Sequence, residues 1–328
     1  MSRIYLKKAT LTSRSDAGET AKTVATILAD IEARGEEAAL EYAAKFDKYD
    51  GNVQLTQDEI DAACAMVPQK LKDDILFAHD NVRRFAEVQK STVADVQFEI
   101  NPGLLAGQKA IPVSAAGCYV PAGRYRHIAS AIMTVTTAKV AGCEHITVCS
   151  APQPGVGIFP AIVYAAHVCG ADKIMAIGGV QGIASMAFGL FGQPRANIIV
   201  GPGNQFVAEA KRTLYGRVGL AMIAGQTDSL ILADKGADPH IVATDLVSQA
   251  EHGYNSPVWL VTDHRPLAED VLSRVPGLIA DLPELNRENA EAAWRDYADG
   301  IVCSCSEEKG ATTGRHGPGQ QTGQGRAP

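Results

Sequence analysis

The stretch TAKVAGCEHITV, residues 137–148, aligns without gaps on AAHVCGADKIMA, residues 165–176. The two copies start 28 residues apart and carry alanine, valine, glycine and isoleucine at the same four positions. Each copy reads as the end of a helix, a glycine suited to a left-handed helix cap, and a short run of β-forming residues. Because a βαβ unit is about 30 residues long, this repeat predicts alternating strands and helices.

The same alternation extends toward the C-terminus. Strands are expected near 145–149, 173–177, 197–200, 219–223, 229–233 and 257–261, and helices near 128–141, 159–169, 180–190, 203–214, 238–251 and 264–275. This order predicts an α/β fold with a largely parallel sheet that helices cover on both faces. Ligands of such sheets bind at the carboxyl ends of the strands.

The N-terminal part is predicted to be mostly helical, from Glu19 to about Lys90. One helix ends near Gly35 and has an apolar stripe formed by Val24, Ile27, Leu28 and Ile31. A second amphipathic helix has its apolar positions at Leu71, Ile75, Ala78, Val82 and Phe85. From 96 to 120 the pattern changes to short strands joined by turns, one of them Asn101-Pro102-Gly103.

Composition excludes several functional classes. The chain has 328 residues, 46% of them hydrophobic, and a net charge of −7, which gives no electrostatic footprint for nucleic acid or anionic lipid. Its apolar runs are too short to cross a bilayer, and its start lacks the apolar core of a signal peptide, so we expect a cytoplasmic protein. The seven cysteines are expected to be free thiols.

The last segment, 306–328, has a different composition. It contains six glycines and no large aliphatic or aromatic residue. Such a stretch cannot bury enough apolar surface to offset the loss of chain entropy, so we expect it to be disordered.

Three glycine-rich turns follow predicted strands, at 117–123, 178–182 and 201–204. Each leads into a helix whose first N–H groups and dipole suit a phosphate or another anion. None has the spacing G-x-G-x-x-G, and any one of them alone is explained by the need for glycine in turns. Three in one region, interleaved with the polar residues Tyr119, Gln181 and Asn204, favour a nucleotide-binding cleft.

A second group of polar residues lies in Ser248-Gln-Ala-Glu-His252-Gly253. Gln249 and His252 are three positions apart, so at a helix end they point from one face and can both approach one cation. Two ligands do not make a zinc site. Taken alone, His252 is best explained as a histidine that interacts favourably with the helix C-terminus beside a capping glycine. The other seven histidines have no second ligand at helical spacing, and we assign them no role.

Several motifs together resemble the histidinol dehydrogenase family. They are CYVPAGRYRHIASAIMTVTTAKVAGC, GGVQGIASMAFG, VGPGNQFVAEAKR, VGLAMIAGQTDSLILAD and ATDLVSQAEHG, and they follow the family's order from about residue 15 to about 305. The resemblance implies a zinc-containing, NAD-dependent homodimer. Such an enzyme oxidises a primary alcohol to a carboxylate by two successive hydride transfers through an aldehyde.

The resemblance also implies roles for six residues. Tyr119, Gln181 and Asn204 would contact NAD, Thr227 would contact substrate, and Gln249 and His252 would bind zinc and face substrate. It thus reverses the interpretation of His252 as a simple helix-terminal histidine.

The sequence departs from the family pattern in the segment that contains Thr227. The family's Ala-Gly-Pro-Ser-Glu is here Ala224-Gly-Gln-Thr-Asp228, which keeps a hydroxyl and loses the proline. Together with NPGLLAGQKAIPV, AEHGYNSP and WRDYADGIVC, this resembles the branch that oxidises 2,3-dihydroxypropane-1-sulfonate to sulfolactate. The alternatives are oxidation of L-histidinol to L-histidine and a catalytically inactive NAD-binding protein.

The inactive alternative depends on the residues after Cys305. Family members continue with a Pro-Glu-His acid/base pair, two further zinc ligands and a C-terminal dimerisation domain, whereas no Pro-Glu-His occurs here. We therefore assign no catalytic residue, expect an incomplete zinc site and little activity, and attribute the change to a truncated or frame-shifted gene.

The domain expectation follows from the resemblance. It comprises an N-terminal segment 1–14 and two Rossmann-like three-layer domains with parallel sheets. The first domain is discontinuous, formed by 15–118 and 228–305, and the second spans 119–227. The tail 306–328 replaces the family's C-terminal domain.

Overall fold

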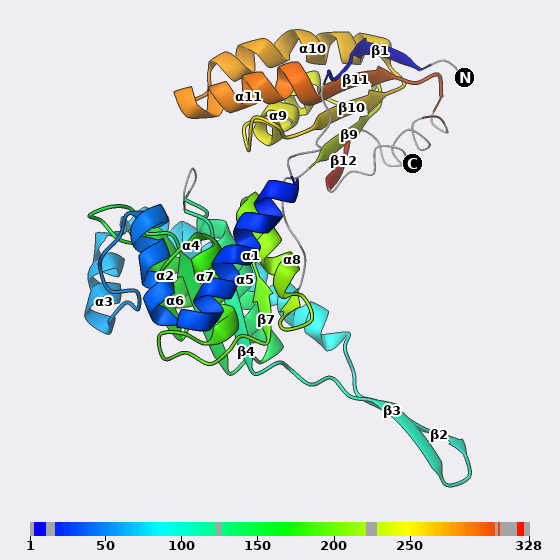
Figure 1. The fold of residues 1–328 in the computed structure, drawn as a ribbon. Coiled ribbons are helices and arrows are strands. Elements are labelled where there is room, and N and C mark those ends of the chain that lie inside the picture. Colours follow the sequence, from blue (N-terminus) through cyan, green and yellow to red (C-terminus); the bar gives the residue numbers. More distant parts are fainter. Residues whose placement is uncertain are drawn as a thin grey trace. The chain divides into compact units, whose positions relative to one another are not determined.

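A computed structural model describes residues 3–10, 17–122, 126–220, 228–305, 308 and 320–324. The chain divides into two compact units (Figure 1). Unit 1 comprises Met1–Asp16 and Gln226–Pro328, and unit 2 comprises Ala17–Gly225. Among the described residues, no helix combines the length and the apolar character needed to cross a membrane.

Unit 2 is built on a five-stranded parallel sheet of order β6-β5-β4-β7-β8. Its strands are β4 (Ala115–Val120), β5 (His145–Ser150), β6 (Lys173–Ala176), β7 (Ile198–Val200) and β8 (Gly219–Leu220). The chain runs from β4 outward through β5 to β6 and then returns to β7 on the other side of β4. The strand order therefore reverses between β4 and β7, and such a switch point leaves a crevice at the carboxyl ends of the two strands.

Helices cover both faces of this sheet, and each face has its own hydrophobic cluster. On one face pack α1 (Ala17–Arg34), α2 (Glu36–Tyr42), α7 (Gly179–Phe188) and α8 (Gln205–Leu214). On the other pack α3 (Gln57–Met66), α4 (Gln69–Ser91), α5 (Ile128–Ala141) and α6 (Pro160–Cys169). The α/β fold with parallel sheets expected from the sequence is thus confirmed.

The internal repeat is confirmed in its local geometry. Gly142 ends α5 and Gly170 ends α6, both in the left-handed conformation, with φ of 101° and 96°. A residue with a side chain is strained there, which is why both copies of the repeat carry glycine at this position. Each cap turns the chain directly into the next strand, β5 or β6.

The structure differs from the expected pattern at two residues of unit 2. Phe85 is 65% exposed, and Ala86 is buried in its place, because the stripe on α4 continues from Val82 by four positions and not by three. Gly117 lies inside β4 and not in a turn. A Cβ on Gly117 would lie 2.8 Å from Met186 Sδ, so this glycine lets α7 approach the sheet closely.

A hairpin of β2 (Val96–Asn101) and β3 (Leu104–Gln108) connects α4 to β4. Pro102 and Gly103 form its turn, and Gly103 has a φ of 82°, as expected from the Asn-Pro-Gly sequence. Every residue of β2 is exposed, as are all but one of β3.

Unit 1 contains a sheet of order β1-β11-β10-β9-β12 in which only β1 is antiparallel to its neighbour. Its strands are β1 (Ile4–Lys7), β9 (Ser229–Ala233), β10 (Val258–Thr262), β11 (Ala298–Val302) and β12 (Gln320–Gln324). Helices α9 (Pro239–Ala250), α10 (Arg265–Ala280) and α11 (Glu284–Tyr297) pack against it around a hydrophobic cluster.

The structure differs from the expected disorder of 306–328 at β12. Residues 320–324 pair in parallel with β9, from Gln320 opposite Ser229 to Gln324 opposite Ala233. Pairing of this kind uses main-chain groups, so a segment without apolar side chains can occupy the open edge of β9.

The division into units also differs from the expected one, which grouped 15–118 with 228–305. Residues 17–118 belong to unit 2, because α1 packs on α7 and α8, and α4 packs on α5. The expected boundary at 118/119 falls inside β4, whose six residues are all buried.

Candidate functional site

Three sequence-predicted residues lie at the carboxyl edge of the sheet in unit 2. Tyr119 belongs to β4, Gln181 to the first turn of α7, and Asn204 immediately precedes α8. The Gly179 N–H donates to the Tyr119 hydroxyl at 3.0 Å, which joins the ends of β4 and α7. Because these elements follow parallel strands, their starting points gather at one edge.

Asp47 is a residue of this edge that the sequence analysis missed. It ends a π-helical turn, Ala43–Asp47, that continues α2. Its Oδ2 accepts hydrogen bonds from Gly178 N and from Gln181 Nε2, both at 3.0 Å. Burial is the main cause that raises the pKa of Asp47, and these two hydrogen bonds oppose it. No local pattern in KFDKYD distinguishes Asp47 from Asp50.

Tyr119 and Gln181 are both buried, with 5% and 1% of their surface exposed. Burial raises the pKa of Tyr119 well above its ordinary value. A protonated phenol that accepts one hydrogen bond still has a hydrogen to donate. The amide of Gln181 is oriented by Asp47.

The turn Gly201-Pro-Gly-Asn204 follows β7 at the switch point. Gly201 has a φ of 108°, and a Cβ there would collide with the main-chain oxygen of Tyr119. Below it, the Lys211 ammonium donates to Gly201 O at 2.8 Å, and burial lowers the pKa of Lys211. This hydrogen bond joins the start of the turn to α8.

Asn204 caps α8, since its Oδ1 accepts from Phe206 N at 3.1 Å and from Val207 N at 3.0 Å. These are the first amide groups of the helix, which have no partner within it. The oxygen of Asn204 is therefore engaged in the cap.

This edge fits a dinucleotide. Ser150, the last residue of β5, is fully buried, and its hydroxyl has no hydrogen-bond partner in the described part of the chain. A polar group of this kind needs a partner, and the hydroxyls and phosphates of a dinucleotide are suitable ones.

The remaining predicted residues belong to unit 1. Gln249 lies in the last turn of α9 and accepts from the Ser229 hydroxyl at 3.2 Å. His252 follows the helix and is exposed, and its N–H donates to Gln249 O at 3.2 Å. The expected helix end is confirmed, since α9 stops at Ala250 and His252 follows two residues later. Thr227 lies outside the described residues.

The described residues do not form a zinc centre. Among them, no group of three His, Cys, Asp or Glu side chains is placed to hold a metal ion. Gln249 and His252 offer one amide oxygen and one imidazole, which falls short of the four donors that zinc takes in proteins.

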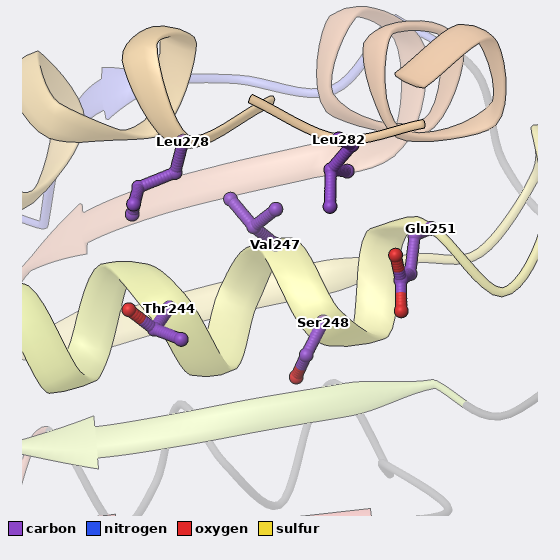
Figure 2. Close-up of a pocket in the computed structure, with 6 residues that line it drawn as sticks. All are labelled: Thr244, Val247, Ser248, Glu251, Leu278 and Leu282. Carbon is purple, nitrogen blue, oxygen red and sulfur yellow. The ribbon is translucent and has the colours of Figure 1, made fainter. Parts of the chain in front are cut away.

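A pocket in unit 1 lies between α9 and the end of α10 (Figure 2). Leu278 and Leu282 point toward Val247 of α9 across it, Ser248 comes from the same helix, and Glu251 is the residue that caps its end. The Glu251 carboxylate already has a partner, because it accepts a hydrogen bond from Asn286 Nδ2 at 3.0 Å. The pocket contains neither Gln249 nor His252, and it is a separate feature from the predicted metal ligands.

The fold is that of an α/β protein with polar side chains at the carboxyl ends of its parallel strands, the edge at which such sheets bind ligands. Residues 11–319 match the family described as histidinol dehydrogenase, and the chain belongs to this family. It is 72% identical to sulfopropanediol 3-dehydrogenase of Ruegeria pomeroyi, over 96% of this chain and 72% of that protein. It is 40% identical to histidinol dehydrogenase of Salmonella typhimurium, over 80% and 60% of the two chains.

A solved structure has the same fold. The chain matches the crystal structure of histidinol dehydrogenase from Elizabethkingia anophelis with a TM-score of 0.87 and 32% sequence identity. The match covers 96% of this chain and 72% of that one. Family and fold together place the protein among the dehydrogenases, as the motifs predicted.

Proposed function

We propose that this protein is an NAD-dependent dehydrogenase that oxidises a primary alcohol to a carboxylate, with 2,3-dihydroxypropane-1-sulfonate as substrate and sulfolactate as product. The observation that carries the choice of substrate is the 72% identity to a sulfopropanediol 3-dehydrogenase. The 40% identity to a histidinol dehydrogenase makes L-histidinol the alternative substrate.

The dinucleotide is proposed to bind unit 2, as in a Rossmann-like domain. NAD supplies the acceptor for the hydride that leaves the alcohol carbon. Tyr119 would offer its phenolic hydrogen and Gln181 its amide oxygen. The switch point between β4 and β7 supports this assignment, because dinucleotides bind there in open α/β sheets.

Gln249, His252 and Thr227 stay proposals for the alcohol site. The resemblance to the family supports them, and the Ser229 hydroxyl holds the Gln249 amide in one orientation. Within the described part of the chain, these residues supply too few donors to complete a zinc site. Zinc binding is tested directly by comparing the zinc content of the wild-type chain with that of His252→Ala.

A homodimer is proposed from the exposed hairpin β2–β3. Isolated two-stranded hairpins are at best marginally stable in water, so this one gains from a partner surface. Val96, Phe98 and Ile100 alternate along β2 and are each more than half exposed. We expect sedimentation to show a dimer, and Phe98→Glu to shift it toward monomer. An unchanged mass for that variant would remove the hairpin from the interface.

The function is tested by NADH formation from NAD with each alcohol. We expect turnover with 2,3-dihydroxypropane-1-sulfonate to exceed that with L-histidinol by at least about 10-fold, because a site that binds one polar substrate rejects an analogue it cannot pair with. A preference for L-histidinol would overturn the proposed substrate. Binding of NAD without NADH formation from either alcohol would support the alternative of a catalytically inactive NAD-binding protein. The gathering of Tyr119, Gln181 and Asn204 at one edge is the observation in favour of that alternative.

A further inference from the structure

The carboxylate of Asp47 occupies the N-terminal end of α7. It comes from a distant part of the chain and accepts from Gly178 N, the cap residue of α7, and from Gln181 in its first turn. The Tyr119 hydroxyl accepts from the next amide, Gly179 N. The position at which a helix N-terminus would bind a phosphate is therefore filled by a carboxylate of the protein itself.

This arrangement determines which ligand groups suit this end of the sheet. A phosphate would meet the negative charge of Asp47, and it would have to compete for amides that already have partners. The group that still lacks a hydrogen-bond partner at this position is an acceptor and not a donor. Asp47 Oδ1 has no hydrogen-bond partner among the described residues, and the side chain is only partly buried, so it can accept from the hydroxyl groups of a ligand.

Asp47 also lies beside the end of β5. A Cβ on Gly178 would lie 2.9 Å from Ala151 Cα and 3.1 Å from Asp47 Oδ1, so Gly178 brings the carboxylate and the residue after β5 close together. Strands β4 and β5 with α5 between them form the first βαβ unit of this sheet. In dinucleotide-binding sheets, an acidic residue near the end of the second strand binds the ribose 2′-hydroxyl of NAD.

We propose that Asp47 determines the preference of this site for NAD over NADP, by accepting hydrogen bonds from the adenosine ribose hydroxyls and repelling a 2′-phosphate. The inference rests on the proposed binding of a dinucleotide to unit 2. It adds the residue that selects between the two dinucleotides, and it places the adenosine ribose, and not the pyrophosphate, beside the start of α7.

The first test measures dissociation constants of NAD and NADP for the full chain and two variants. Asp47→Asn keeps the size of the side chain and removes its charge, and Asp50→Asn removes a charge from an exposed position three residues away. We expect the wild type and D50N to prefer NAD by at least about 10-fold, and D47N to lose most of that preference by binding NADP more tightly. An unchanged preference in D47N would overturn the inference.

The two proposals fail differently. If the wild type binds neither dinucleotide, the proposed function is wrong and the inference falls with it. If the wild type binds NAD and D47N keeps its preference, only the inference is wrong.

A second test needs no variant and covers the case in which D47N does not fold. It compares binding of AMP, 2′-deoxy-AMP and adenosine 2′,5′-bisphosphate to the wild-type chain by calorimetry. AMP is expected to bind most tightly, because 2′-deoxy-AMP lacks the hydroxyl and the bisphosphate adds a charge facing Asp47. Equal or tighter binding of the bisphosphate would overturn the inference.

Discussion

The Tyr119 hydroxyl is a structural group as well as a proposed ligand contact. It accepts the Gly179 N–H inside the core, where 5% of Tyr119 is exposed. Tyr119→Phe leaves this amide without its partner, and we expect the free energy of unfolding to fall by about 1–3 kcal/mol. Urea unfolding measures it, with Tyr215→Phe as control, because Tyr215 is 73% exposed. A loss no larger than that of the control would contradict the role of the hydrogen bond.

Asp47 predicts a pH dependence of stability. Burial raises its pKa in the folded state above the ordinary value of 3.8, so above that pH the folded state holds more protons on this group than the unfolded state. Its contribution to stability therefore falls as pH rises from 3.8 through the folded pKa. We expect the stability of the wild type minus that of Asp47→Asn to decrease over this window. Chemical denaturation between pH 3.5 and about 7 measures the difference, and an increase would contradict the raised pKa.

At this scale the sequence predicts residues that lie beside glycine-rich turns. The pattern indicates Tyr119, Gln181 and Asn204, because polar side chains beside such turns reach the carboxyl edge of a sheet, and the structure places them there. Asp47 could not be selected in this way. Its position depends on how a helix on one face of the sheet ends, and tertiary packing fixes that end.

At the scale of elements, the two repeat copies depend on their glycine caps. Gly170 has a φ of 96°, and the nearest atoms to a Cβ there belong to the flexible side chain of Lys139, so backbone strain is the main cost of a substitution. We expect Gly170→Ala to lower the free energy of unfolding by about 1–2 kcal/mol. Gly18→Ala is the matched control, because Gly18 lies in α1 with open space around it and alanine favours helix. Equal effects of the two variants on urea unfolding would contradict the cap.

Periodicity and glycine positions predict most of the elements between 128 and 280. The strands and helices expected there lie close to β5, β6, β9, β10, α5, α6 and α9. Each of these strands has a buried apolar run, and each of these helices has an apolar stripe with an N-cap residue before it or a glycine after it. β12 was not predicted, since its residues carry no apolar pattern and its order comes from the open edge of β9. Phe85 was misplaced because the α4 stripe shifts by one residue at that point.

At the scale of the whole molecule, the structure groups the segments differently from the expectation that the family resemblance implied. It assigned residues 15–118 to the unit that contains β9 and β10, although the buried stripe of α1 packs in the same cluster as Tyr119, Met175 and Ile183. Sequence reveals that Val24, Ile27, Leu28 and Ile31 are buried, but it does not reveal which sheet buries them. The partner surface is fixed by long-range contacts, and one sequence contains no record of those.

The two groupings predict different independent folding units. Residues 17–225 contain both hydrophobic clusters of the unit 2 sheet with all the helices that cover them, so we expect this fragment to unfold in one cooperative transition. The fragment 119–227 starts inside the fully buried β4 and lacks α1, α2 and α4, which leaves apolar surface of both faces exposed to water. We expect it to aggregate or to remain unfolded. Circular dichroism with urea titration of the two purified fragments measures this, and a folded 119–227 beside an unfolded 17–225 would show that α1, α2 and α4 belong to the other sheet.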